Sequence, residues 1–208
     1  MSHALYRQGA NKNLGNDLVI MAAAAKGFND QGAAPKERRF FEIVQRHGPV
    51  NMGEITIGSV HQMDAEEIKG RLPVTALVHT VFTDPATLAQ VLREVKEADL
   101  GLSITVSGLF EALGECCGKV ELHPYGVEQS LGIIGRTDLL PEGGILEIGT
   151  MCGHGLVSLR LIDLLAERIR EGATTAETAS RELAKQCVCG IFNPARARAL
   201  LEEMTSGA

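Results

Sequence analysis

The residues best suited to chemistry lie in the stretch Ile145–Ser158. This stretch has the pattern of a short apolar strand, a tight turn and the start of a long helix, and Cys152 lies in the turn. The amides of Gly153, His154 and Gly155 would lack intrahelical partners there, so they would form an anion-binding site with a partial positive charge. The same setting lowers the pKa of a thiol. We therefore predict that Cys152 and His154 are catalytic and that the two glycines bind a small anionic metabolite.

A structural interpretation of the same turn stays open. Cysteine is a small residue that is often buried, and glycines permit a sharp connection between a strand and a helix without any ligand. Under this interpretation Cys152 is a packing residue of the core.

A second cluster consists of Cys187 and Cys189, at the end of a predicted helix. Thiols separated by one residue can face the same side of a loop, and soft ligands favour zinc, copper(I) or iron–sulfur centres. Together with Cys152 and His154 they would supply three thiolates and an imidazole, while three cysteines alone could hold a cluster with one open iron. We expect zinc or an iron–sulfur cluster on Cys152, Cys187 and Cys189. The alternative is a buried pair of cysteines without a ligand.

The segment Met151–Gly155 resembles the part of proline racemases and related epimerases in which a cysteine at a helix N-terminus acts as acid and base. The resemblance would make Cys152 the thiol and the amides after it the cradle for a carboxylate. That family has a second, pseudo-symmetric half with its own cysteine, and this chain has no equivalent half. The activity is therefore not carried across.

The segment Ile145–Thr150, followed by Gly153, resembles the first glycine-rich motif of S-adenosylmethionine-dependent methyltransferases. In that family a strand ends in glycines that admit the cofactor. The resemblance implies an S-adenosylmethionine-binding protein that holds the cofactor at the Ile145–Gly155 turn. Those enzymes continue with further strands, whereas the rest of this chain has helical patterns, so only a permuted order of elements would fit.

Three further residues are candidates for substrate binding. Arg136 follows a glycine and could hold a carboxylate or phosphate. His79, in a predicted strand, and His123, before a proline, could reach the Cys152 turn if their segments adjoin it. The alternative is that Arg136 is an exposed loop charge and that the histidines are hydrogen-bonded structural residues.

The elements that must position these residues are clearest in the middle of the chain. Val74–Phe82 is rich in β-branched residues, Asp84 and Pro85 can cap and start a helix, and Leu100–Val106 has the pattern of the next strand. A strand, a helix and a strand with short links predict a parallel pair. We therefore predict an α/β fold with a parallel or mixed sheet layered with helices, and a helical C-terminal extension.

The predicted boundary divides the chain into an α/β domain, residues 1–172, and a helical C-terminal segment, residues 173–208, which carries Cys187 and Cys189. Within the first domain, residues 1–72 give weak signals. Asn193 and Pro194 can cap and start the final helix, and we expect its apolar side to mediate a homodimer.

Composition limits the partners. The net charge of −6, the absence of tryptophan and the presence of only two tyrosines disfavour nucleic acid. No apolar run approaches the roughly 20 residues that a membrane span needs. Five cysteines without a regular framework suit a reducing compartment, so we expect a cytoplasmic protein.

The sequence predicts a thiol- or metal-dependent enzyme that acts on a small anionic metabolite. The alternative is a non-catalytic subunit that binds a metal or ligand, or that serves a larger enzyme complex.

Overall fold

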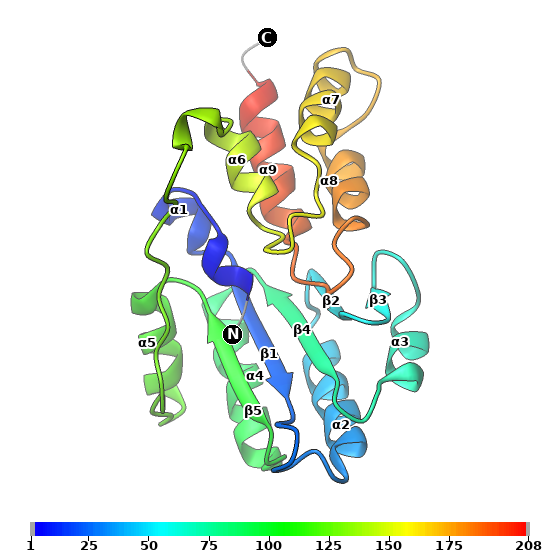
Figure 1. Cartoon of the computed structure of the whole chain (residues 1–208), viewed down its shortest axis with the longest axis vertical. Helices are drawn as coiled ribbons and strands as arrows, with labels where there is room; N and C mark the ends of the chain where they lie inside the picture. The colour runs from blue at the N-terminus through cyan, green and yellow to red at the C-terminus, as the bar shows by residue number, and fades with distance from the viewer. Residues whose placement is uncertain (1–2, 207–208) are drawn as a thin grey trace.

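The computed structural model of the chain describes residues 3–206 and contains one antiparallel five-stranded sheet. The strands lie side by side in the order β3-β2-β4-β1-β5, and β1 pairs with β4 on one side and with β5 on the other (Figure 1). Their bounds are β1 Leu18–Ala23, β2 Asn51–Glu54, β3 Gly58–Ser59, β4 Leu77–Phe82 and β5 Ser103–Ser107.

The prediction of a parallel or mixed sheet is wrong. β4 and β5 do run in the same direction, as a strand–helix–strand unit requires, but β1 lies between them and is antiparallel to both. The strand–helix–strand unit that runs from β1 to β2 is divided in the same way, because β4 lies between these two strands. This is the split β-α-β arrangement. Local sequence fixes the direction of successive strands, but the choice of neighbour depends on a strand from far along the chain.

One face of the sheet is covered by α2, Ala33–Arg46, and α4, Pro85–Ala98. The predicted start of α4 is confirmed, because the carboxylate of Asp84 accepts hydrogen bonds from the amides of Ala86 and Thr87. Alternate strand residues face these helices and form a buried core with them. This core includes Leu18, Ile20, Val78 and Phe82 of the sheet and Phe40, Phe41, Leu88 and Val91 of the helices.

The C-terminal helices gather at one end of the sheet, where they are yellow to red in Figure 1. They share one buried core with Val19 and Val81 of the opposite sheet face, which confirms the predicted helical C-terminal region. Because the helices before and after residue 172 share this core, the region extends back to α6. The bounds are α6 Gly143–Gly149, α7 Leu159–Arg170, α8 Ala176–Ala184 and α9 Pro194–Thr205.

The prediction of a strand before Cys152 is wrong, because residues 143–149 form α6. A short apolar run has no decisive period, so tertiary packing selects its conformation. Ile148 is fully buried in the C-terminal core, and Gly144 lies so close to Met204 that a Cβ would come within 2.3 Å of the sulfur. Without this strand, the glycine-rich motif for S-adenosylmethionine lacks the element on which it depends.

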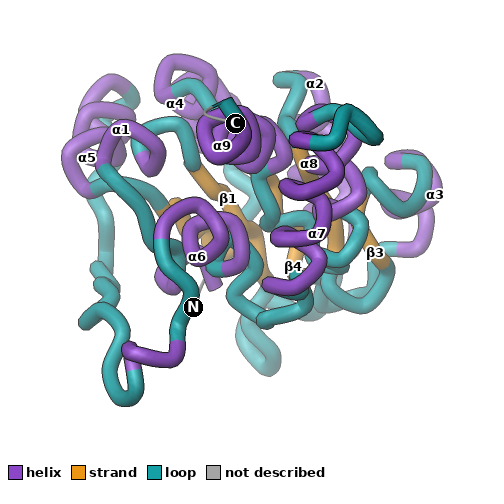
Figure 2. Tube along the Cα trace, turned by 90° about the horizontal axis from the view of Figure 1, so that it is seen from above, coloured by secondary structure: helices purple, strands orange, loops and turns teal. Residues whose placement is uncertain are grey.

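The remaining elements are short or peripheral. The segment between α5 and α6, residues 120–142, forms no strand and runs along the outside of the molecule (Figure 2). The remaining elements are η1 His3–Tyr6, α1 Asn11–Leu14, α3 Ala65–Arg71, α5 Phe110–Lys119 and η2 Thr137–Leu139.

Among residues 3–206, none of the helices combines the length and the apolar character that a membrane span requires.

A buried polar network joins the N-terminal turn to the C-terminal helices. The carboxylate of Asp17, just before β1, accepts hydrogen bonds from the guanidinium groups of both Arg7 and Arg196. Arg196 also pairs with Glu147 of α6 at 2.9 Å. Buried charges are costly unless they are paired in this way. The network therefore favours one mutual arrangement of the first turn, β1, α6 and α9.

Glu37 of α2 provides a test of the core on the other face. Burial raises the pKa of its carboxyl from 4.5 to about 7, opposed by the amide of Ala24 and reinforced by Glu54. The folded state therefore holds a proton that the unfolded state loses, so the free energy of unfolding falls as pH rises from 4.5 to 7. The full loss is about 3 kcal/mol above that range. We expect Glu37→Gln to remove most of this fall in urea denaturation at several pH values.

The exposed Glu97→Gln is the matched control, and it should retain the fall seen in the wild type. Parallel stability profiles for the wild type and Glu37→Gln would contradict the prediction.

Candidate functional site

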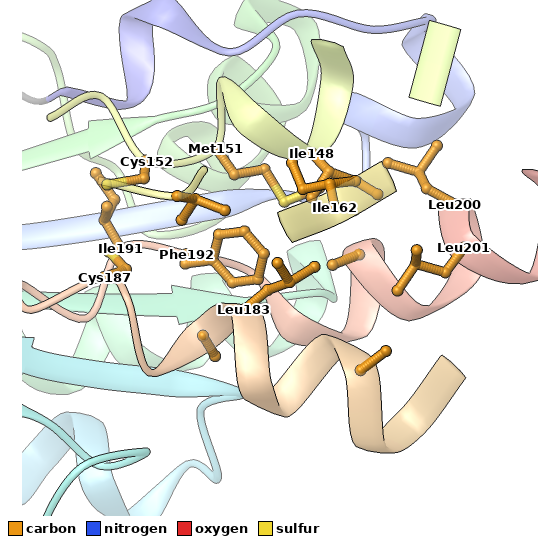
Figure 3. Packing of buried hydrophobic residues seen from close by; sticks show 14 of the residues in the cluster. Ile148, Met151, Cys152, Ile162, Leu183, Cys187, Ile191, Phe192, Leu200 and Leu201 are labelled. Carbon is orange, nitrogen blue, oxygen red and sulfur yellow. The ribbon is translucent and has the colours of Figure 1, made fainter. Parts of the chain in front are cut away.

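The two cysteine segments converge on one place in the structure. The sulfurs of Cys187 and Cys189 are 3.7 Å apart, and the sulfur of Cys189 is 3.7 Å from Nδ1 of His154. Cys152 shares a hydrogen bond with Cys187. Figure 3 shows Cys152 and Cys187 at the same end of the packed core, beside Ile191. We call Cys152, His154, Cys187 and Cys189 the thiol cluster.

Cys152 does not lie at the N-terminus of a long helix, as the sequence had suggested. It lies in the turn that follows α6, and α7 begins only at Leu159. The hydroxyl of Ser158 caps that helix by accepting a hydrogen bond from the amide of Leu161. The positive end of α7 is therefore at Ser158, and the expected effect of a helix N-terminus on Cys152 has no structural basis.

Backbone amides surround the sulfurs instead of forming an open anion site. The amides of His154 and Leu156 donate hydrogen bonds to the sulfur of Cys152. The sulfur of Cys187 accepts from Phe192, and that of Cys189 accepts from Ile191. Each such bond favours the charged thiolate over the thiol. The turns around the cysteines are therefore built to stabilise negative charge on sulfur.

The three thiols differ in their pKa values. The hydrogen bond to Cys187, followed by burial, raises the pKa of Cys152 well above its ordinary range, so the predicted low pKa of this thiol is wrong. For Cys187, the bond from Cys152 lowers the pKa, but the bond to Cys189 and burial together outweigh it and raise the pKa to about 11. The bond from Cys187 lowers the pKa of Cys189 despite burial. Cys189 is therefore the first of the three to ionise.

All three cysteines are buried, with exposed fractions of 2% for Cys152 and 0% for Cys187 and Cys189. They belong to the C-terminal hydrophobic core. His154 and Gly153 are only half-buried, and Gly155 is exposed. The cluster therefore has its sulfurs inside and its imidazole toward the surface. A direct attack by Cys152 on a metabolite would require the turn to open.

A close backbone contact holds the second cysteine segment on the sheet. Gly190 has a φ of +78°, and a Cβ there would come within 2.3 Å of the amide nitrogen of Gly53 in β2. A Cβ on Gly53 would in turn lie 3.2 Å from the carbonyl carbon of Cys189. The side-chain amide of Asn51 also donates a hydrogen bond to the carbonyl of Phe192 at 2.8 Å. Two glycines thus allow the loop to lie directly against the backbone of β2.

The other predicted binding residues only partly gather at this place. His79 is buried in β4 and pairs with Gly53 across the strands, so its side chain projects from the face that Cys189 approaches. His123 is exposed in the segment after α5. Arg136 is exposed and forms an ion pair with Asp138. Within residues 3–206, no hydrogen bond or ion pair links Arg136 to the thiol cluster.

Sequence reasoning missed the residues that support the cluster from outside. Arg7 donates a hydrogen bond to the carbonyl of Ile191, next to the cysteine segment. Gly53 and Asn51 belong to a strand with weak sequence signals. The sequence does contain one usable signal, because Asn193 was recognised as a helix cap, and its amide nitrogen also donates to Asp17 at 2.9 Å.

In the part of the chain that the structure describes, no group of three or more His, Cys, Asp or Glu side chains stands ready to hold a metal ion. Comparisons of the chain with protein-family models, curated proteins and solved structures give no match.

The contact between Gly190 and Gly53 predicts an unusually damaging substitution. In Gly190→Ala, the new Cβ would combine a left-handed backbone, which costs about 1–2 kcal/mol, with overlap against β2, which costs about 1–3 kcal/mol more. Gly172→Ala is the matched control, because its φ is +71° and nothing lies within 4 Å of a Cβ there. Urea denaturation should show a clearly larger loss for Gly190→Ala, whereas equal losses would refute the contact.

Proposed function

We propose that the thiol cluster binds a soft metal centre, with Cys152, Cys187 and Cys189 as ligands. The observation that carries the proposal is that backbone amides donate hydrogen bonds to all three sulfurs while these sulfurs lie against one another. Hydrogen bonds to ligand sulfurs are a regular feature of metal–thiolate sites, where they tune the centre. Buried cysteines that serve only as packing residues need no such amides.

The spacing of the donors supports the same conclusion. In a tetrahedral site with Zn–S bonds of about 2.3 Å, two sulfurs lie about 3.8 Å apart, and a sulfur and a nitrogen lie about 3.5 Å apart. The distances from Cys189 to Cys187 and to His154 are both 3.7 Å. These two pairs therefore have the separation of neighbouring ligands. For a tetrahedral site, the side chains of Cys152 and His154 must still shift so that both can bind the same metal ion as Cys187 and Cys189.

Electrostatics supplies the reason for a cation. Three adjacent thiolates repel one another, and Cys187 helps to raise the pKa of Cys152 as Cys189 helps to raise that of Cys187. A cation at the centre would remove this repulsion and displace the shared protons. Sulfur ligands select zinc, copper(I) or iron–sulfur centres over magnesium and calcium. Zinc and an iron–sulfur cluster are the two forms that three cysteines and one histidine hold best.

Whether His154 binds the metal would determine whether the centre is structural or catalytic. As a fourth ligand, it would close the site and make the metal structural. If it remains outside the coordination shell, the fourth position would face the half-buried side of the cluster, and a small metabolite could reach the metal there. The complete burial of Cys187 and Cys189 favours the structural role, in which the metal fastens the C-terminal helices to β2. A catalytic role on an anionic metabolite remains the second candidate, favoured by the partial exposure of His154.

Metal binding can be tested on protein purified without oxygen. We expect one zinc ion, or one iron–sulfur cluster after reconstitution with iron and sulfide, per chain of the wild type. Cys187→Ala/Cys189→Ala should lose it, because two of the three sulfur ligands are gone. Cys117→Ser is the matched control, since this half-buried cysteine of α5 lies outside the cluster. Elemental analysis and the visible absorption spectrum distinguish zinc from iron–sulfur. Wild-type metal content no higher than that of the double variant would refute the proposal.

The pKa values predict how affinity depends on pH. The raised pKa values of Cys152 and Cys187 mean that both thiols carry protons near neutral pH. Because metal binding must displace at least these two protons, the apparent association constant for zinc should rise at least about 100-fold per pH unit near neutrality. Competition with a chromophoric chelator at constant ionic strength measures this slope. An affinity independent of pH would show that these thiols are not ligands.

A further inference from the structure

One edge of the sheet is open for pairing. β5 is an edge strand that pairs with β1 only, so alternate residues direct their backbone N–H and C=O groups away from the sheet. Within residues 3–206, no backbone hydrogen bond connects Ser103–Ser107 to any element except β1. The other edge strand, β3, has only two residues. Short length protects an edge from further pairing, and β5 lacks this protection.

β5 also lacks the other features that protect edge strands. Its sequence, Ser-Ile-Thr-Val-Ser, has no charge and no proline, and β-branched residues occupy its centre. A hollow of about 1430 Å³ borders all five of its residues, and its lining also includes residues of α5 and residues 122–130. Four of the five residues are only half-buried. The strand therefore has both an unused hydrogen-bonding edge and space beside it.

We propose that β5 pairs with β5 of a second copy of this chain, antiparallel and centred on Thr105, to form a continuous ten-stranded sheet. The strand is self-complementary about this point. In the proposed register Ser103 lies opposite Ser107 of the other copy, and Ile104 lies opposite Val106. Polar residues thus meet polar residues, apolar residues meet apolar residues, and Thr105 meets its own counterpart on the two-fold axis. This symmetry favours a second copy over an unrelated extended peptide.

Exposed apolar side chains are concentrated in the segment that follows β5. Of the fifteen large hydrophobic residues that are exposed among residues 3–206, eight lie between residues 110 and 140. Their combined exposed area is of the order of the ~800 Å² per partner that a stable interface buries. The eight residues are Phe110, Tyr125, Val127, Leu131, Ile133, Ile134, Leu139 and Leu140, with exposed fractions from 36% to 87%.

The final helix is a weaker candidate for dimerisation than the sequence suggested. The apolar side of α9, including Ala197, Leu200 and Leu201, is buried against the other C-terminal helices of the same chain. That surface is therefore already covered. In the described part of the chain, by contrast, the backbone of β5 is hydrogen-bonded to β1 alone, so its outer edge is free to pair.

Substitutions at Thr105, which lies on the proposed two-fold axis, test the dimer with variants as well as with the wild type. Thr105→Lys and Thr105→Glu each place like charges opposite each other, so each variant alone should be monomeric. An equimolar mixture should form the heterodimer, because opposite charges then face each other. Recovery in the mixture also shows that both variants are folded. Gln90→Lys and Gln90→Glu, on the exposed side of α4, are the matched controls.

Sedimentation velocity over a concentration series distinguishes the outcomes. We expect the wild type and the Gln90 variants to have twice the mass of the 22.2 kDa chain at high concentration. The Thr105 variants should have the mass of one chain when alone and of two chains when mixed. A wild type that stays monomeric at the highest concentration would overturn the proposal. So would Thr105 variants that dimerise as the controls do, or a mixture that fails to restore the dimer.

Discussion

The structure depends on the contact between the backbone of Gly190 and that of Gly53. Because neither residue has a Cβ, the loop that carries Cys187 and Cys189 can lie directly on β2. Such an approach leaves no room for a Cβ at either glycine, and Asn51 secures it with a hydrogen bond to the loop. The contact joins the two layers of the molecule and places sulfur atoms at the boundary between them. Fold and candidate chemistry therefore share one constraint.

The charged network around Asp17 restricts the same boundary from the other side. Arg7 and Arg196 both donate to this carboxylate, and all three side chains are almost fully buried. Burial of charges gives little net stability, but an incorrect arrangement would leave one of them unpaired. The network therefore acts mainly through specificity. It holds the first turn, the start of β1 and the start of α9 in a single arrangement, and Arg7 extends that arrangement to Ile191, beside the cysteines.

The thiol cluster shows how packing and acidity depend on each other. The folding of distant segments brings three sulfurs into contact, and contact prevents them from ionising together without a cation. The same turns direct backbone amides at each sulfur, which favours negative charge there. Without a cation, the repulsion between the thiolates opposes the stabilising effect of the amides. A bound cation would resolve the conflict, which is why the proposed function follows from electrostatics as much as from ligand geometry.

Local sequence determined the elements whose signals are short-range. The cap at Asp84 and the apolar stripe of α4 specify that helix, because both depend on residues only a few positions apart. The residue types of the cluster were recognisable for the same reason, since cysteine and histidine between glycines stand out. Tertiary structure decided the neighbours. It placed β1 between β4 and β5, formed α6 where a strand was expected, and buried Cys152. Such outcomes depend on contacts between residues far apart in the chain, and a single sequence read locally does not contain them.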